Sequence, residues 1–159
     1  MRYKVIDVCR HIINYSNEKG YGVSNLKLQK LLYFVQAYFL LVKKEACFYE
    51  RIEAWDFGPV VPVAYREYKQ FGSANIPRIT YVIEKNHDNV WDSKIVPFLD
   101  MVILPEDKRL IDSVVDKYSE YLASDLVRLT HKQKPWMDAY EPNKNNEITI
   151  AAIEEFFND

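Results

Sequence analysis

The sequence predicts a mainly α fold of the α+β class: one compact helical domain over residues 1–159, built around a central apolar helix, with a small β-hairpin or short edge strands. Only 4 of the 159 residues are glycine, which is sparse for a β-barrel or for an enzyme whose backbone cradles phosphate. Hydrophobic residues make up 48% of the chain and charged residues 28%, which suffices for a core without disulfides or metal. Apolar residues also recur at helical spacing along most of the chain.

The first expected helix begins at Val5 and ends near Gly20, because glycine readily adopts the left-handed conformation that closes a helix. His11 falls on its polar side. Ser24 offers an N-cap oxygen for a second helix that runs to about Lys43. This second helix is apolar on two sides, which predicts a central position in the fold.

A narrow polar seam on the second helix contains Gln29 and Gln36, which need hydrogen-bond partners if they are buried. Residues 48–55 are rich in β-formers and predict a short strand or an extended edge. In residues 56–62 two prolines and a glycine predict a stiff turn.

Pro62 is suited to the first position of a third helix that ends before Gly72. Residues 79–84, turn formers at 85–89 and the apolar pair at 90–91 indicate a small hairpin or a surface excursion.

Three more helices are expected towards the C-terminus. Pro105 opens the first. Ser124 caps the second, which runs through Leu126 to His131 and is ended by Pro135, and Thr149 caps a last short helix.

The sequence indicates no catalytic or metal-binding site. The cysteines and histidines, Cys9, His11, Cys47, His87 and His131, lack the close spacing of a zinc site. There is no phosphate-binding loop, nucleophile elbow or zinc-protease motif, so we expect no cofactor and no enzyme. His131 permits two interpretations, a general base or proton switch, and a helix-terminal histidine bonded to nearby backbone; the second is favoured.

Binding to another protein is the favoured activity. A net charge of −2 gives no overall field for nucleic acid, although the basic cluster at residues 128–134 could contact phosphate. The longest apolar stretch, residues 31–42, is interrupted by Gln36 and is shorter than the ~20 residues of a membrane span, so no membrane association is expected. Two distant cysteines among apolar residues are typical of buried thiols in a reducing compartment, which predicts a cytoplasmic protein. Aromatic residues, 14% of the chain, are the type that anchors protein interfaces.

Three local patterns resemble one known family. They are NLKLQKLLYF at residues 25–34 followed by Gln36-Ala37, EAWDFGPVVP at residues 53–62 with Tyr65, and LTH at residues 129–131 with Pro135-Trp136. In order and spacing they are similar to the Panacea domain of the SocA-like antitoxins, which occur in bacterial toxin–antitoxin pairs and on prophage-related elements. Residues 76–104 match no pattern of this family.

The resemblance implies a cytoplasmic antitoxin that neutralises a cognate toxin by direct protein–protein binding. It also implies two alternatives: an adaptor that delivers the toxin to a cellular protease, and a DNA-binding regulator. The family implies no catalytic, cofactor or metal residues. The motif positions expected to form the scaffold that shapes the partner surface are Lys27, Gln29, Lys30, Trp55, Gly58, Pro59, Pro62, Tyr65, His131, Pro135 and Trp136.

Overall fold

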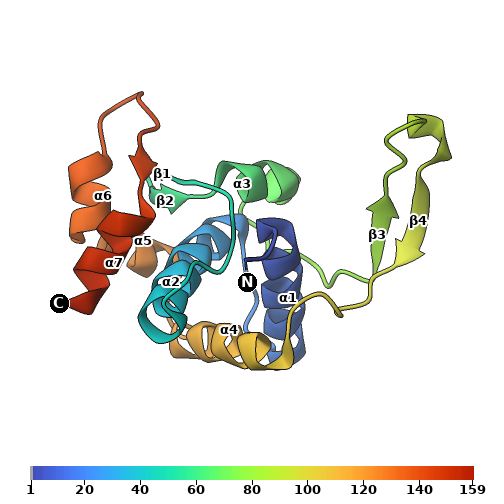
Figure 1. The fold of residues 1–159 in the computed structure, drawn as a ribbon, viewed down its shortest axis with the longest axis horizontal. Helices are drawn as coiled ribbons and strands as arrows, with labels where there is room; N and C mark the ends of the chain where they lie inside the picture. Colours follow the sequence, from blue (N-terminus) through green and yellow to red (C-terminus); the bar gives the residue numbers. More distant parts are fainter. Residues whose placement is uncertain (1) are drawn as a thin grey trace.

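The helical body is organised around α2 (Asn25–Lys43), and the computed structural model describes residues 2–159. α2 contacts α1 (Val5–Lys19), α4 (Pro105–Lys117), α5 (Ala123–His131) and α7 (Ile150–Asn158). Figure 1 shows these helices packed around it. The predicted fold class and the central position of the second helix are therefore confirmed.

α1 ends and α2 begins where the sequence predicts. Gly20 takes the left-handed conformation with φ +74° at the end of α1, and the Ser24 hydroxyl accepts a hydrogen bond from the Lys27 N–H at 3.3 Å. Both seam glutamines are buried and bonded: the Gln36 side-chain oxygen accepts from the Cys47 N–H at 2.7 Å. Cys9 and Cys47 are buried free thiols, as expected.

A three-stranded antiparallel sheet covers one end of α2. Its order is β2 (Gly58–Val60), β1 (Ile52–Trp55), β5 (Glu147–Ile148). The predicted strand at 48–55 is confirmed in its second half, whereas the prediction that all of residues 56–62 form a turn is wrong. Only Asp56 and Phe57 turn, and the chain then pairs back on β1 with Glu53 opposite Val60. Pro59 is tolerated in β2 because this is an edge strand, where a missing N–H costs least.

α3 (Pro62–Tyr68) follows directly, with Pro62 in its first turn, and continues as the short 3₁₀ helix η1 (Lys69–Phe71) up to Gly72. This agrees with the predicted third helix.

Towards the C-terminus, α4 begins at Pro105 and the Thr149 hydroxyl caps α7, accepting from the Ala152 N–H at 3.1 Å. Two expectations are wrong. α5 is preceded by Leu122, whose N–H donates to the Asp125 carboxylate at 2.8 Å, so Ser124 lies inside the helix. α5 ends at His131 as predicted, but Pro135 is not the residue that ends it. Pro135 lies in the first turn of a further short helix, α6 (Lys134–Ala139), where its fixed φ fits.

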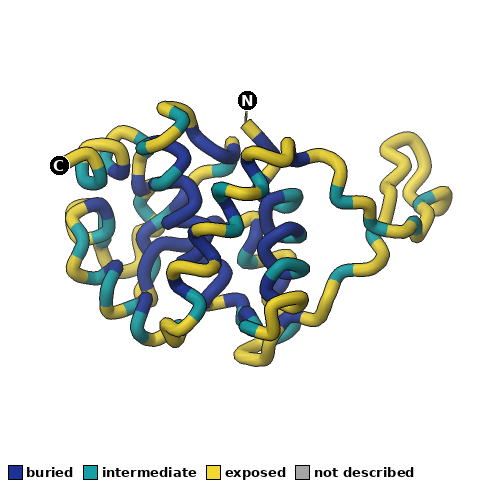
Figure 2. The backbone as a smooth tube through the Cα atoms, turned by 90° about the horizontal axis from the view of Figure 1, so that it is seen from below, coloured by how far each residue is buried: buried dark blue, intermediate teal, exposed yellow. Residues whose placement is uncertain are grey.

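A hairpin stands away from the body (Figure 1). It consists of β3 (Tyr81–Glu84), the 3₁₀ turn η2 (Val90–Asp92) and β4 (Lys94–Pro97). We call residues 80–98 the arm. Figure 2 shows that almost all of it is exposed. The predicted hairpin is confirmed, but its return strand begins four residues later than predicted, because residues 90–91 belong to η2.

His11 corrects another expectation. Helical periodicity places it on the polar side of α1, yet it is buried between α4 and the chain segment after the arm, with only 8% of its surface exposed. Within residues 2–159 no helix is long and apolar enough to cross a membrane.

Candidate partner-binding site

The three motif segments meet at one corner of the body. Residues 25–34 lie in the first half of α2, residues 53–62 form β1, its turn and β2, and residues 129–136 join α5 to α6. α2 contacts β2, α5 contacts β2, and α6 contacts β1. We call this junction the corner. The fold thus brings together segments that are up to about 100 residues apart in the sequence.

Lys30 is the buried centre of the corner. Its side chain is fully buried, and its Nζ donates to the Pro59 carbonyl oxygen at 3.0 Å. Burial lowers the pKa of Lys30 to about 7. Gly58 has φ +106°, and a Cβ at this position would lie 2.7 Å from Lys30 Cε and 2.9 Å from the Thr130 hydroxyl. The turn can therefore pack on α2 only with glycine at position 58, and Lys30 acts as scaffold behind it.

A chain of amide hydrogen bonds fixes the exit from the corner. The Gln29 side-chain oxygen accepts from the Val61 N–H at 2.9 Å, and its amide nitrogen donates to the Asn25 side chain at 2.9 Å. Asn25 in turn donates to the Tyr65 carbonyl at 3.1 Å. The start of α3, with buried Pro62, is therefore held against α2.

Aromatic side chains brace the turn from the C-terminal side. The Trp136 indole N–H donates to the Trp55 carbonyl at 2.9 Å. The rings of His131 and Tyr140 stack on Trp136 with centroid distances of 4.1 and 4.5 Å. His131 Nε2 lies 2.9 Å from the Asp56 carbonyl oxygen, which can only accept, so this nitrogen carries the proton and is not free to act as a base. This is the backbone-bonded arrangement that was favoured for His131.

The outer surface of the corner holds a cleft of about 470 Å³. Its large apolar and aromatic lining residues are Leu26, Trp55, Phe57, Val60, Tyr65 and Tyr140. Phe57, at the tip of the turn, is 66% exposed. Trp55 is half-buried and meets Tyr65 edge-on at 5.0 Å between ring centroids. Within residues 2–159 no group of three or more His, Cys, Asp or Glu is placed to hold a metal ion. Because of its large apolar and aromatic lining residues, the cleft can offer apolar contact area to a partner.

Most of the predicted motif residues lie in this corner. Pro135 is buried in the first turn of α6 beside it. Lys27 is the exception, because its Nζ donates to the Ser119 carbonyl at 3.1 Å, beyond the end of α4. Sequence reasoning missed Phe57 and Tyr140 as site residues. A large apolar residue at the tip of a two-residue turn could have indicated Phe57, whereas nothing in the local sequence marks Tyr140.

Comparison with known proteins shows which family the chain resembles. Residues 28–137 match the sequence model of the family described as "Antitoxin SocA-like, Panacea domain". A relative, Antitoxin SocA of Caulobacter vibrioides (strain NA1000 / CB15N), is 36% identical over 119 residues, which are 72% of this chain and 58% of that protein. The chain thus spans less than two thirds of this relative's length. No solved structure matches the chain.

Proposed function

Because the chain belongs to the SocA-like antitoxin family with the Panacea domain, we propose that it is an antitoxin that neutralises a cognate toxin by direct protein–protein binding. The neutralising unit is the folded chain itself, acting in a stoichiometric complex and without a reaction of its own. It works in the cytoplasm, where the toxin is made.

The observation that carries the proposal is an apolar cleft on a rigid corner. Phe57 is exposed to solvent at a turn, and the backbone that follows this turn, at Pro59 and Val61, is bonded to α2 through Lys30 and Gln29. Protein interfaces draw most of their binding energy from a few large, preorganised side chains, among which aromatic residues are enriched. Trp55, Tyr65 and Tyr140 line the same cleft as Phe57.

The mechanism follows from this division of roles. Lys30, Gly58 and Gln29 set the position of the turn from behind, and the exposed aromatic side chains contact the toxin. Binding covers the toxin's functional surface or holds the toxin in an inactive form. The amount of toxin stays constant in either case, whereas delivery to a protease would lower it.

The test is co-expression with the product of the adjacent gene, which should arrest growth when it is expressed alone. This chain should restore growth and co-purify with that product at unchanged toxin level. Phe57→Ser should weaken the complex by about 2 kcal/mol or more, as expected for an interface anchor. Tyr49→Ser is the matched control, because Tyr49 is 64% exposed and lies outside the cleft.

Three results would contradict the proposal or part of it. A product of the adjacent gene that fails to bind this chain refutes direct neutralisation. A fall in toxin level in parallel with rescue indicates protease delivery instead. Equal effects of Phe57→Ser and Tyr49→Ser would show that the cleft is not the contact surface.

A further inference from the structure

The arm presents an uncovered apolar face. In its register Tyr81 lies opposite Pro97 and Ile83 opposite Ile95, and residues directly opposite each other in an antiparallel pair share one face. All four side chains are exposed, as is Trp91 near the tip. An isolated two-stranded hairpin is only marginally stable in water, and a third strand or a packing partner is usually required. The arm therefore lacks an element that would complete it.

The hydrogen-bonding pattern shows which backbone groups are free. The Phe98 N–H donates to the Thr80 carbonyl at 2.8 Å, so this pair is of the hydrogen-bonded type. Bonded and non-bonded pairs alternate along an antiparallel ladder, so the Tyr81–Pro97 and Ile83–Ile95 pairs are non-bonded. Their N–H and C=O groups consequently point away from the arm, towards its two outer edges.

The two edges differ. On the β4 edge Pro97 has no N–H, and proline is one of the residues that protect sheet edges from pairing. The β3 edge carries no proline, so both Tyr81 and Ile83 offer an N–H and a C=O. A further strand can therefore pair with β3 and not along the whole of β4.

Asn14 shows to which side the β3 edge faces. Ile79 precedes Tyr81 by two residues, and its N–H and C=O bond the Asn14 side chain of α1 at 2.7 and 3.0 Å. Asn14 thus occupies the edge position that a neighbouring strand would take. A groove of about 440 Å³ lies here, between α1 and the base of the arm. The free β3 edge continues from this groove.

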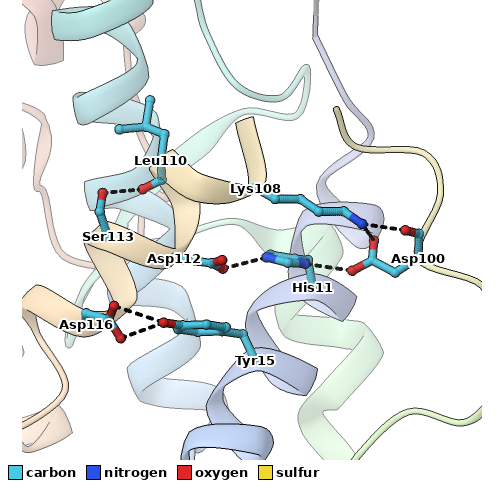
Figure 3. A network of polar contacts seen from close by, with 8 residues as sticks. All are labelled: His11, Tyr15, Asp100, Lys108, Leu110, Asp112, Ser113 and Asp116. Atoms are coloured by element: carbon cyan, nitrogen blue, oxygen red, sulfur yellow. Dashed lines mark hydrogen bonds and ion pairs between the residues drawn. The ribbon is translucent and has the colours of Figure 1, made fainter. Parts of the chain in front are cut away.

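The base of the arm is fixed to the body by a polar network. His11 lies between Asp100 and Asp112, with N···O distances of 2.7 and 2.6 Å, and Lys108 also reaches Asp100 (Figure 3). Asp100 follows the arm by two residues. Entry and exit of the arm are therefore both held, by Asn14 and His11 of the same helix, and the β3 edge keeps its orientation towards α1.

We propose that the β3 edge of the arm binds an extended segment of the partner toxin as a third strand, with apolar side chains at alternate positions that cover Tyr81 and Ile83. This inference rests on the proposed function, because it names a contact of the same partner. A second copy of the chain fits less well. Its arm has two strands, and its own β4 would be placed about 5 Å further towards α1, whose residues His11, Asn14, Tyr15 and Glu18 line that side of the groove.

The experiment is amide hydrogen exchange of this chain, alone and bound to the growth-arresting product of the adjacent gene. In the free chain the Tyr81 and Ile83 amides should exchange rapidly, and in the complex at least about tenfold more slowly, because each gains a strand hydrogen bond. Ile83→Pro should raise the Kd at least about tenfold, since it removes one bonding N–H and disfavours the added strand.

Ile95→Pro is the matched control, because it removes the equivalent outward N–H from the opposite edge at the paired position. It should change the Kd less than about threefold, and circular dichroism should show that both variants remain folded. Protection confined to β4, or absent from the arm of a tight complex, overturns the inference and leaves the proposed function intact. Protection of β3 that grows with the chain's own concentration assigns the edge to a second copy and also overturns it. A chain that forms no complex at all refutes the proposed function itself.

Discussion

Replacing Lys30 by methionine should stabilise the protein, and most strongly near neutral pH. Methionine keeps a similar length and fills the same space, but it removes a cation that burial disfavours. The pKa of Lys30 is about 7 in the folded chain, against an ordinary value of 10.5. Between these two values the unfolded chain binds more protons than the folded chain, so the stability that depends on Lys30 rises with pH.

The magnitude follows from the two pKa values. The parent loses stability as the pH falls from about 10.5, and the loss levels off below about pH 7. The penalty for neutralising or burying the ammonium amounts to about 4 kcal/mol at pH 7 and about 2 kcal/mol at pH 9. Methionine leaves the Pro59 carbonyl without its donor, which costs about 1–3 kcal/mol. Lys30→Met should therefore be more stable by about 2 kcal/mol at pH 7, and about equal to the parent at pH 9.

Urea unfolding at several pH values between about 7 and 9 measures this difference directly. Tyrosines such as Tyr33, whose pKa is raised by burial, also contribute to the pH dependence, but equally in parent and variant. Lys132→Met serves as the control, because Lys132 is exposed. When the free energy of unfolding is plotted against pH, the curves of this variant and of the parent should be parallel. If the curves of the parent and Lys30→Met are also parallel, the folded chain does not hold Lys30 with a lowered pKa, and the reasoning is refuted.

Three further predictions concern the corner and the arm. Gly58→Ala should lower the free energy of unfolding in urea by more than about 2 kcal/mol, because Gly58 has a positive φ and the added Cβ would meet the side chain of Lys30. Gly72→Ala is the control: Gly72 has φ +57° but open space around it, so the change should cost only about 1 kcal/mol. Trp55→Ala should cost about 2 kcal/mol, less than the ~3–5 kcal/mol of a fully buried aromatic ring, since Trp55 is half-buried; an unchanged thermal melt would place the ring outside the packed structure. Burial alone would lower the pKa of His11, but its hydrogen bonds to Asp100 and Asp112 raise it above the ordinary value. The ion pairs of protonated His11 with these aspartates therefore stabilise the base of the arm at low pH, and this stabilisation is lost as the pH rises through the raised pKa. His11→Gln should accordingly speed amide exchange at residues 98–101 at about pH 5.5 and have much less effect at high pH, and an equal effect at both would contradict the assignment.

The helices were predictable because their signals are local. Periodicity places α1, α2 and α4, and the terminal residues Gly20 and Thr149 mark helix ends through bonds to their own neighbours. The short strand β5 was not predicted, since its two residues are stabilised by pairing with β1, a segment far away in the sequence. β2 was not predicted because its glycine and proline indicate a turn, although proline is tolerated in an edge strand.

The misplaced return strand of the arm has a similar cause. Val90 and Trp91 are β-formers, but the Asn89 side chain accepts from the Trp91 N–H at 3.1 Å and closes a 3₁₀ turn there. The strand begins later, in the register that leads to the Thr80–Phe98 bond. His11 was misassigned because its burial comes from α4 and the segment after the arm, which helical periodicity cannot include.

The candidate site was predictable in its scaffold and less so in its surface. Gln29, Lys30, Gly58 and Trp136 belong to recognisable motifs, and the structure places them together. Phe57, the proposed contact residue, was not singled out, because its exposure depends on a turn of two residues where a longer one was expected.

Lys30 links the stability of the corner to its proposed use. A methionine would be the more stabilising residue at this position, yet it could not donate to the Pro59 carbonyl. The segment that follows the turn would then lose one of its two hydrogen bonds to α2 side chains. Proteins depart from the most stabilising choice mainly at functional sites, where geometry matters more than stability. If the turn is built to present Phe57 to a toxin, Lys30→Met should gain stability and lose affinity for the toxin together. Should the variant be more stable and bind equally well, the buried lysine would have no role in shaping the contact surface.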